Sequence, residues 1–178
     1  MKGLCKNKKK RAVSKQPICG LWAIAKCCGI KLKNQNDVQA FRQKCLQNRL
    51  VNRTGNWVGG TTAEERRNIC AHFQHDMQEM FTDILHKKGP NTTVTVQTLL
   101  KNRQFFTTQQ QYILEVDKHV VYVRTNRTKR KLWVADQRAK PMRLLKSKTQ
   151  TPDPEIVPLL AQHVVSVVAV TPFSISMQ

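Results

Sequence analysis

The stretch KQPICGLWAIAK places Cys19 just behind Pro17, at the head of an apolar run that only Lys26 interrupts. A thiol at the N-terminus of a helix meets unpaired backbone N–H groups and the positive end of the helix dipole, and both lower its pKa. The thiolate is the nucleophilic form of cysteine. Cys19 is therefore a candidate nucleophile. The alternative, a small packed core residue like Cys27 and Cys28, stays open.

A histidine and a carboxylate that suit such a nucleophile occur in a predicted hairpin. The segments HVVYVRT and RKLWVAD are rich in β-branched residues, and a loop over 126–129 would join them. Thr125 then faces Arg130, and His119 faces Asp136 with Cβ atoms about 5 Å apart on one side of the sheet. The carboxylate can fix the tautomer and orientation of the imidazole. Each residue alone has a structural explanation, but together with Cys19 they favour a triad.

Three short segments carry a resemblance to a known family. CGLWA at 19–23, KHVVYV at 118–123 and LWVAD at 132–136 resemble, in this order, the papain-like cysteine proteases, and most of all compact viral members such as picornavirus leader proteases. The resemblance implies that Cys19 is the nucleophile, His119 the general base and Asp136 the residue that orients it. The family's oxyanion-hole Gln or Asn lies further upstream of the cysteine than Gln16 does. Gln16 or the backbone N–H of Cys19 is the expected donor.

The cysteines and histidines do not predict a metal site or a disulfide framework. All six cysteines lie in the first 70 residues, and no CxxC pair occurs among them. Cys70 and His72 are two positions apart on a predicted helix, so they face different directions. The sequence therefore predicts a hydrolase that needs no cofactor.

The net charge is the strongest compositional signal. Thirty-one Lys and Arg against eleven Asp and Glu give +20, which attracts polyanions. Two dense basic clusters are the expected contacts with RNA or DNA, through phosphates and without sequence preference. Their members are Lys8, Lys9, Lys10 and Arg11 in an N-terminal arm, and Arg127, Lys129, Arg130 and Lys131 in the predicted hairpin loop.

Element patterns predict an α+β fold, and the resemblance implies that it is of the papain-like type, in which a central helix bearing Cys19 packs on an antiparallel sheet. We expect a flexible basic arm over 1–15 and one domain over 16–178, helical to about 103 and a sheet from about 104. No apolar run is long enough to span a membrane, and no signal peptide is evident, so an intracellular, unsecreted protein is expected. The length suits one core.

Several elements can be predicted individually. The apolar run from Cys19 to about Ile30 predicts a helix, which Gly29 should end. A second helix should begin at Asn36 or Asp37, either of which can cap it. A third should follow the Thr61–Glu64 or Thr62–Glu65 capping pattern, because apolar residues continue at helical spacing as far as Ile84. A short helix is expected at 96–100, and strands at 112–116, 119–123, 131–135 and 164–170.

The resemblance implies a viral cysteine protease that acts on polypeptides, at peptide or ubiquitin-like isopeptide bonds, and the basic clusters predict that it also binds nucleic acid. The cationic surface suits ubiquitin poorly, because ubiquitin's usual binding face is itself basic. The alternative function is a basic structural or nucleic-acid-binding protein, without catalysis, on a papain-like scaffold. The sequence does not indicate an oligomeric state.

Overall fold

The computed structural model shows an α+β protein. It describes residues 18–54, 57, 60–81, 93–101, 106, 111–117, 119–125, 132–135, 142–144 and 157–174. The helices are α1 (Cys19–Cys27), α2 (Gln35–Gln47), α3 (Ala63–His72), α5 (Val96–Lys101) and α6 (Val157–Leu160). The strands are β1 (His75–Glu79), β2 (Gln111–Val116), β3 (His119–Thr125), β4 (Leu132–Ala135), β5 (Met142–Leu144) and β6 (Val164–Pro172).

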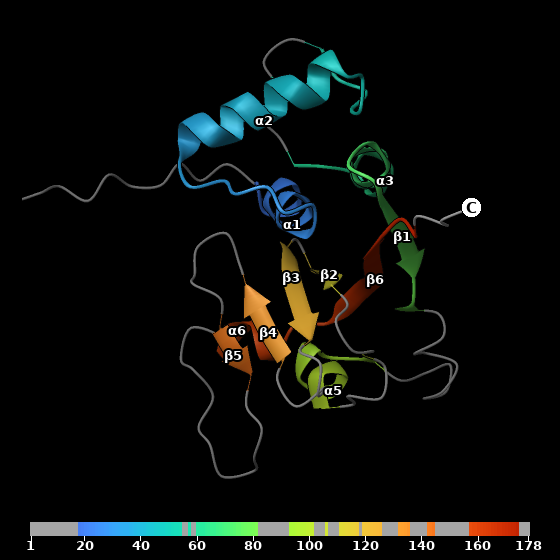
Figure 1. Ribbon diagram of the computed structural model, residues 1–178. Coiled ribbons are helices and arrows are strands. Elements are labelled where there is room, and N and C mark those ends of the chain that lie inside the picture. The colour runs from blue at the N-terminus through green and yellow to red at the C-terminus, as the bar shows by residue number, and fades with distance from the viewer. Residues whose placement is uncertain are drawn as a thin grey trace, which may run out of the picture.

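The strands form one antiparallel sheet in the order β1-β6-β2-β3-β4-β5. The last strand, β6, lies between the first strand and β2, so segments from both halves of the chain share the sheet (Figure 1). β2 and β3 make a tight hairpin, in which Val116 pairs with His119. This hairpin fixes the backbone at the start of β3.

Apolar residues cover both faces of the sheet. On one face, α1 packs against Ile113, Val120 and Tyr122 in a cluster that also includes residues of α2 and α3. On the other face, α5 and α6 pack against Leu114 and Val121. The layers are visible in Figure 1, with α1, α2 and α3 above the strands and α5 below them. Burial on both faces explains why β2 and β3 read as continuous apolar runs.

Helix α1 begins and ends as its sequence predicts. It starts at Cys19, and Gly29 follows it with a φ of 74°, a conformation that glycine adopts without strain. Leu21, Ile24 and Ala25 are fully buried, as expected for an apolar central helix. Among the described residues, no helix is long and apolar enough to cross a bilayer.

Two helix predictions need correction. The cap of α2 is Asn34, whose side chain accepts a hydrogen bond from the backbone N–H of Asp37, so the helix begins before Asn36. The capping box at Thr62 and Glu65 is confirmed, but α3 ends at His72 instead of continuing towards Ile84.

The physical reason for the early end of α3 is a change of backbone direction at Gln74. This residue has a φ of 62°, which an α-helix does not accommodate. The chain then enters β1, which pairs with β6 over His75–Glu79. Strand β1 therefore lies inside residues 16–103, which the sequence assigns to the helical part.

The four predicted strands are confirmed within two residues at each end, as β2, β3, β4 and β6. The predicted register of the β3–β4 hairpin is wrong. Thr125 lies opposite Leu132 instead of Arg130, and Tyr122 lies opposite Ala135. The connection between the strands is two residues longer on the β4 side than the assumed loop. The length of the connection sets the register of a hairpin, so every residue of β3 pairs two positions farther along β4 than predicted.

Candidate active site

Cys19 is the first residue of α1, and its side chain is half-buried. Ile18 precedes the helix and offers no side-chain cap, while the Ile18 carbonyl accepts the N–H of Trp22 at 2.8 Å. The thiol therefore lies beside the unpaired N–H groups of the first turn. Partial exposure leaves the sulfur open to a reagent or substrate.

His119 is the first residue of β3, and its side chain hydrogen bonds the sulfur of Cys19. The two residues thus begin the helix and the strand that pack together. Farther along, Lys26 of α1 lies over the ring of Tyr122 of β3. Helix and strand therefore run side by side in the same direction. Cys19 and His119 therefore lie next to each other where the helix and the strand begin.

Opposing effects act on the Cys19 thiol, and the net result favours the thiolate. Burial raises its pKa, whereas the hydrogen bond and positive charge of His119, with the backbone N–H groups of Val120 and Gly20, lower it. The lowering contributions win, so the pKa of Cys19 lies below its ordinary value. A half-buried thiol with a lowered pKa beside an imidazole is the arrangement found in reactive cysteines.

The segment that leads into α3 packs against the start of α1. Arg66 donates to the Thr61 carbonyl at 2.7 Å and to Glu115 of β2 at 2.8 Å, so it joins this segment to the sheet. A Cβ placed on Gly20 would overlap the Thr61 hydroxyl and approach Nη1 of Arg66 to 3.3 Å. Gly20 thus permits the close contact that holds the first turn of α1.

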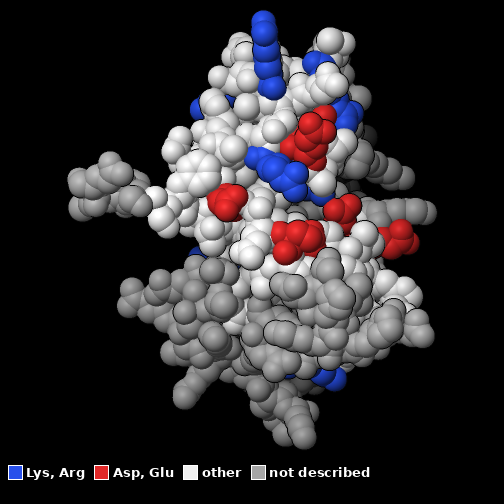
Figure 2. Space-filling view, turned by 90° about the vertical axis from the view of Figure 1, so that its right-hand side faces the viewer, with Lys and Arg blue, Asp and Glu red and all other residues white. Residues whose placement is uncertain are grey.

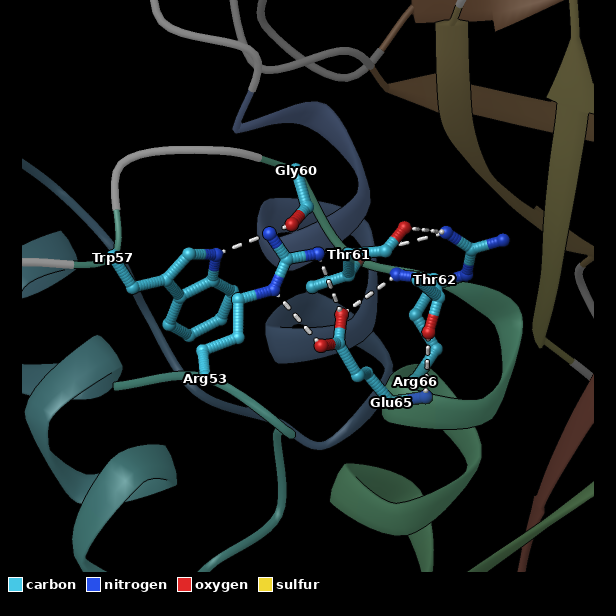
Figure 3. Close-up of polar contacts among 7 residues, drawn as sticks. All are labelled: Arg53, Trp57, Gly60, Thr61, Thr62, Glu65 and Arg66. Carbon is cyan, nitrogen blue, oxygen red and sulfur yellow. Dashed lines mark hydrogen bonds and ion pairs between the residues drawn. The ribbon is translucent and has the colours of Figure 1, made fainter. Parts of the chain in front are cut away.

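Polar contacts keep this supporting segment in place, as Figure 3 shows. Arg53 binds both carboxylate oxygens of Glu65, at 3.0 and 3.3 Å. Glu65 in turn accepts the backbone N–H of Thr62 at 2.8 Å. The indole N–H of Trp57 donates to the Gly60 carbonyl at 3.2 Å. The segment from Gly60 to Thr62, which packs against the start of α1, is therefore held by Arg53 and Trp57 before it and by Glu65 after it.

A groove of about 550 Å³ opens along the side of α1. Trp22 and Lys26 follow Cys19 on the same stripe of the helix, three and seven residues on, and both line the groove. Its other walls come from the segment after α1 and from β2, β3 and β4. The groove therefore begins about one helical turn from Cys19.

Hydrogen bonds fix the floor of this groove. The Tyr122 hydroxyl donates to Oε1 of Gln111 at 2.8 Å, and Nε2 of Gln111 donates to the carbonyl of Cys27 at 3.1 Å. Burial, together with the nearby Cys27, raises the pKa of Tyr122 to about 12. The phenol therefore stays neutral and holds the end of α1 onto β2 and β3. No local sequence pattern indicates this groove, because its walls come from separate elements.

The remaining predicted site residues lie outside the described part of the chain. These are Gln16 and Asp136, and also the basic residues Lys8, Lys9, Lys10, Arg11, Arg127, Lys129, Arg130 and Lys131. The direct pairing of His119 with Asp136 was deduced from the Thr125–Arg130 register, and the observed ladder does not have that register. The proposed role of Asp136 now depends on the family resemblance alone.

The other described cysteines are packed into the core or next to it. Cys27, Cys45 and Cys70 are buried, and Cys28 is half-buried and hydrogen bonded to Cys70. All of them are free thiols. Among the residues that the structure describes, no group of three or more His, Cys, Asp or Glu side chains is arranged to hold a metal ion.

Comparison of the chain with protein-family models, with curated proteins and with solved structures gives no match. The site must therefore be interpreted from its own geometry.

Proposed function

We propose that this protein is a papain-like thiol hydrolase that cleaves peptide bonds, or isopeptide bonds of similar chemistry, with Cys19 and His119 at its centre. The observation that carries the proposal is the hydrogen bond between His119 and a half-buried thiol at the first residue of α1. Burial alone would make this thiol inert, yet its pKa is lowered. The packing of helices on an antiparallel sheet supports the papain-like assignment. The order along the chain, with Cys19 on the first helix and His119 on a later strand, supports it too.

The proposed reaction has two stages. The Cys19 thiolate attacks the substrate carbonyl carbon, and a C–S bond forms while the carbonyl becomes an oxyanion. His119, protonated in the ion pair, gives its proton to the departing amine as the C–N bond breaks. Water then attacks the thioester with His119 as base, and the carboxylic acid product leaves as Cys19 is regenerated.

Two further residues have proposed positioning roles. Asp136 would orient the His119 ring by accepting its second N–H, and Gln16 would help the backbone N–H of Cys19 to bind the oxyanion. We expect Asp136→Asn to retain more activity than Asp136→Ala, because an amide oxygen still accepts that N–H. Removal of a single oxyanion donor typically lowers kcat about 100-fold to 1,000-fold, and this is the effect expected of Gln16→Ala.

A peptide library tests the proposal without a known substrate. The full chain is incubated with a proteome-derived library, and new peptide termini are identified by mass spectrometry. We expect a defined set of cleavages that is lost in both Cys19→Ala and His119→Ala. A Lys44→Ala variant, changed at an exposed position of α2, serves as the control and should cleave as the unmodified protein does.

Reactivity of the thiol separates the hydrolase from the alternative function. Iodoacetamide should modify Cys19 before Cys27, Cys28, Cys45 and Cys70, and His119→Ala should slow that modification. If Cys19 reacts no faster than the buried cysteines and no cleavage appears, a basic structural or nucleic-acid-binding protein without catalysis is the better description.

A further inference from the structure

Cations line the groove beside α1. Lys26, Lys31, Lys33 and Arg124 contribute to its walls, and among the described lining residues there is no Asp or Glu. Burial lowers the pKa of Lys26, and repulsion from Arg124 and Lys31 adds to this effect. The four side chains therefore form a local excess of positive charge that an anionic ligand would offset.

Aromatic rings share these walls with the cations. Trp22 and Trp133 are half-buried and Tyr122 is buried, and all three line the groove. The ammonium of Lys26 is 5.3 Å from the centre of the Trp22 ring and 5.5 Å from that of Tyr122, which holds the lysine side chain inside the groove. Arg124 lies directly opposite Trp133 in the β3–β4 ladder. Lys26 and Arg124 are thus each next to an aromatic side chain.

Acidic side chains are concentrated elsewhere in the described structure. Glu64 and Glu65 belong to α3, and Asp76 and Glu79 to β1. Figure 2 shows acidic side chains gathered on the face that carries α3 and β1, with basic ones between them. β1 is at one edge of the sheet, and β3 and β4 lie towards the other edge (Figure 1). The groove is lined by β3 and β4 and therefore lies away from β1. These four acidic residues therefore lie away from the groove, whereas Asp37 accepts the backbone N–H of Lys33, one of the lining residues.

We propose that the groove between α1 and strands β3 and β4 binds single-stranded nucleic acid, with phosphates at Lys26, Lys31 and Arg124 and bases against the rings of Trp22 and Trp133. The groove alternates cationic and aromatic side chains. Single-stranded nucleic acid alternates phosphates and bases, so its groups can pair with those of the groove. Base–aromatic stacking tolerates any sequence, because every base has a flat aromatic face. A duplex keeps its bases stacked inside and cannot offer them to the rings.

The carboxylates of an acidic peptide could pair with the cations of the groove, but they would not stack on its aromatic rings. The groove is also of the size that small ligands occupy, about 300–1,000 Å³. The net charge of +20 further favours a polyanion over a peptide with a few carboxylates. This inference does not depend on the proposed hydrolase activity, since it concerns side chains beyond Cys19.

The test uses the full chain with Cys19→Ala, so that its outcome is independent of any cleavage. Fluorescein-labelled oligothymidylate is titrated by anisotropy at several salt concentrations, and quenching of tryptophan fluorescence by the unlabelled oligomer is recorded in parallel. The groove variant carries Lys26→Gln and Arg124→Gln. The matched control carries Lys44→Gln and Arg67→Gln, which remove the same charge from exposed positions of α2 and α3. Circular dichroism verifies that both variants fold.

We expect the groove variant to bind at least tenfold more weakly than the control and to lose the quenching. Its log–log salt slope should be shallower by about 0.7 for each phosphate contact removed. Equal weakening in the two variants, or binding without quenching, would place the nucleic acid elsewhere on the chain and overturn the proposal. If oligoglutamate competes as well as oligothymidylate of equal charge, the groove is a site for acidic peptides and the proposal is wrong.

Discussion

Gly20 lies against Thr61 so closely that residue 20 has no space for a side chain. The contact joins the first turn of α1 to the segment that enters α3, and Arg66 holds that segment to β2 through Glu115. The position of Cys19 thus depends on packing by its neighbour in the sequence as well as on the helix itself.

Gly20→Ala should destabilise the protein by about 1–3 kcal/mol, because the new methyl group forces the Thr61 side chain or the helix to shift. Urea unfolding measures the loss. Gly20→Ala combined with Thr61→Ala should recover part of it, since the second change removes the hydroxyl that obstructs the first. Additive losses in the double variant would show that the contact does not limit the position of α1.

The pH dependence of Cys19 alkylation should reveal its partnership with His119. Because the pKa of Cys19 lies below its ordinary value, the reactive thiolate is present at lower pH than for a free cysteine. His119→Ala removes the largest lowering contribution and leaves the effect of burial, so the rate–pH profile should move to higher pH. Peptide mapping after iodoacetamide pulses measures the profile. An unchanged profile in the variant would mean that His119 does not influence the thiol.

Much of the site follows from local sequence signals. The start of α1 at Cys19, its end near Gly29 and the capping box at Thr62 are all determined within a few residues of chain. These features can be predicted because helix propensity, capping residues and the pattern of buried positions all favour the same structure there.

Other features depend on contacts between distant segments. The apolar residues after α3 fit a helical period, yet the positive φ of Gln74 and pairing with β6 make the next segment a strand. The β3–β4 register depends on the length of the connection, which the residue types alone did not reveal. The groove is lined by Trp22, Tyr122 and Trp133, which come from three different elements, so no continuous sequence motif predicts it.

The core cysteines should remain unreactive in the native protein. Burial raises the pKa of Cys45 to about 12 and that of Cys27 above its usual range, while the hydrogen bond with Cys28 and burial raise the pKa of Cys70. We expect iodoacetamide at pH 8 to leave these three thiols unmodified while Cys19 reacts. Full modification in urea confirms that they are free. Rapid labelling of Cys45 in the native state would contradict its burial in the α2 layer.

Glu65 should give the protein an acid-sensitive component of stability. Burial opposes ionisation, but the Arg53 ion pair and the Thr62 N–H lower the pKa of Glu65 below its usual value of 4.5. A depressed folded-state pKa stabilises the protein above the unfolded-state value, and this stabilisation is lost as the pH falls through the folded-state value.

Glu65→Gln keeps a side chain that can complete the capping box but removes the charge that pairs with Arg53. At neutral pH the variant should lose about 1.5–3 kcal/mol of unfolding free energy, which is typical of a hydrogen bond to a charged group. The difference from the unmodified protein should shrink below pH 4.5, where Glu65 itself becomes protonated. Thermal unfolding across this pH range measures the trend. Glu64→Gln removes the same charge from an exposed position in the same turn, and its effect should be smaller. Equal losses in the two variants would assign the effect to the helix dipole instead of the Arg53–Glu65 pair.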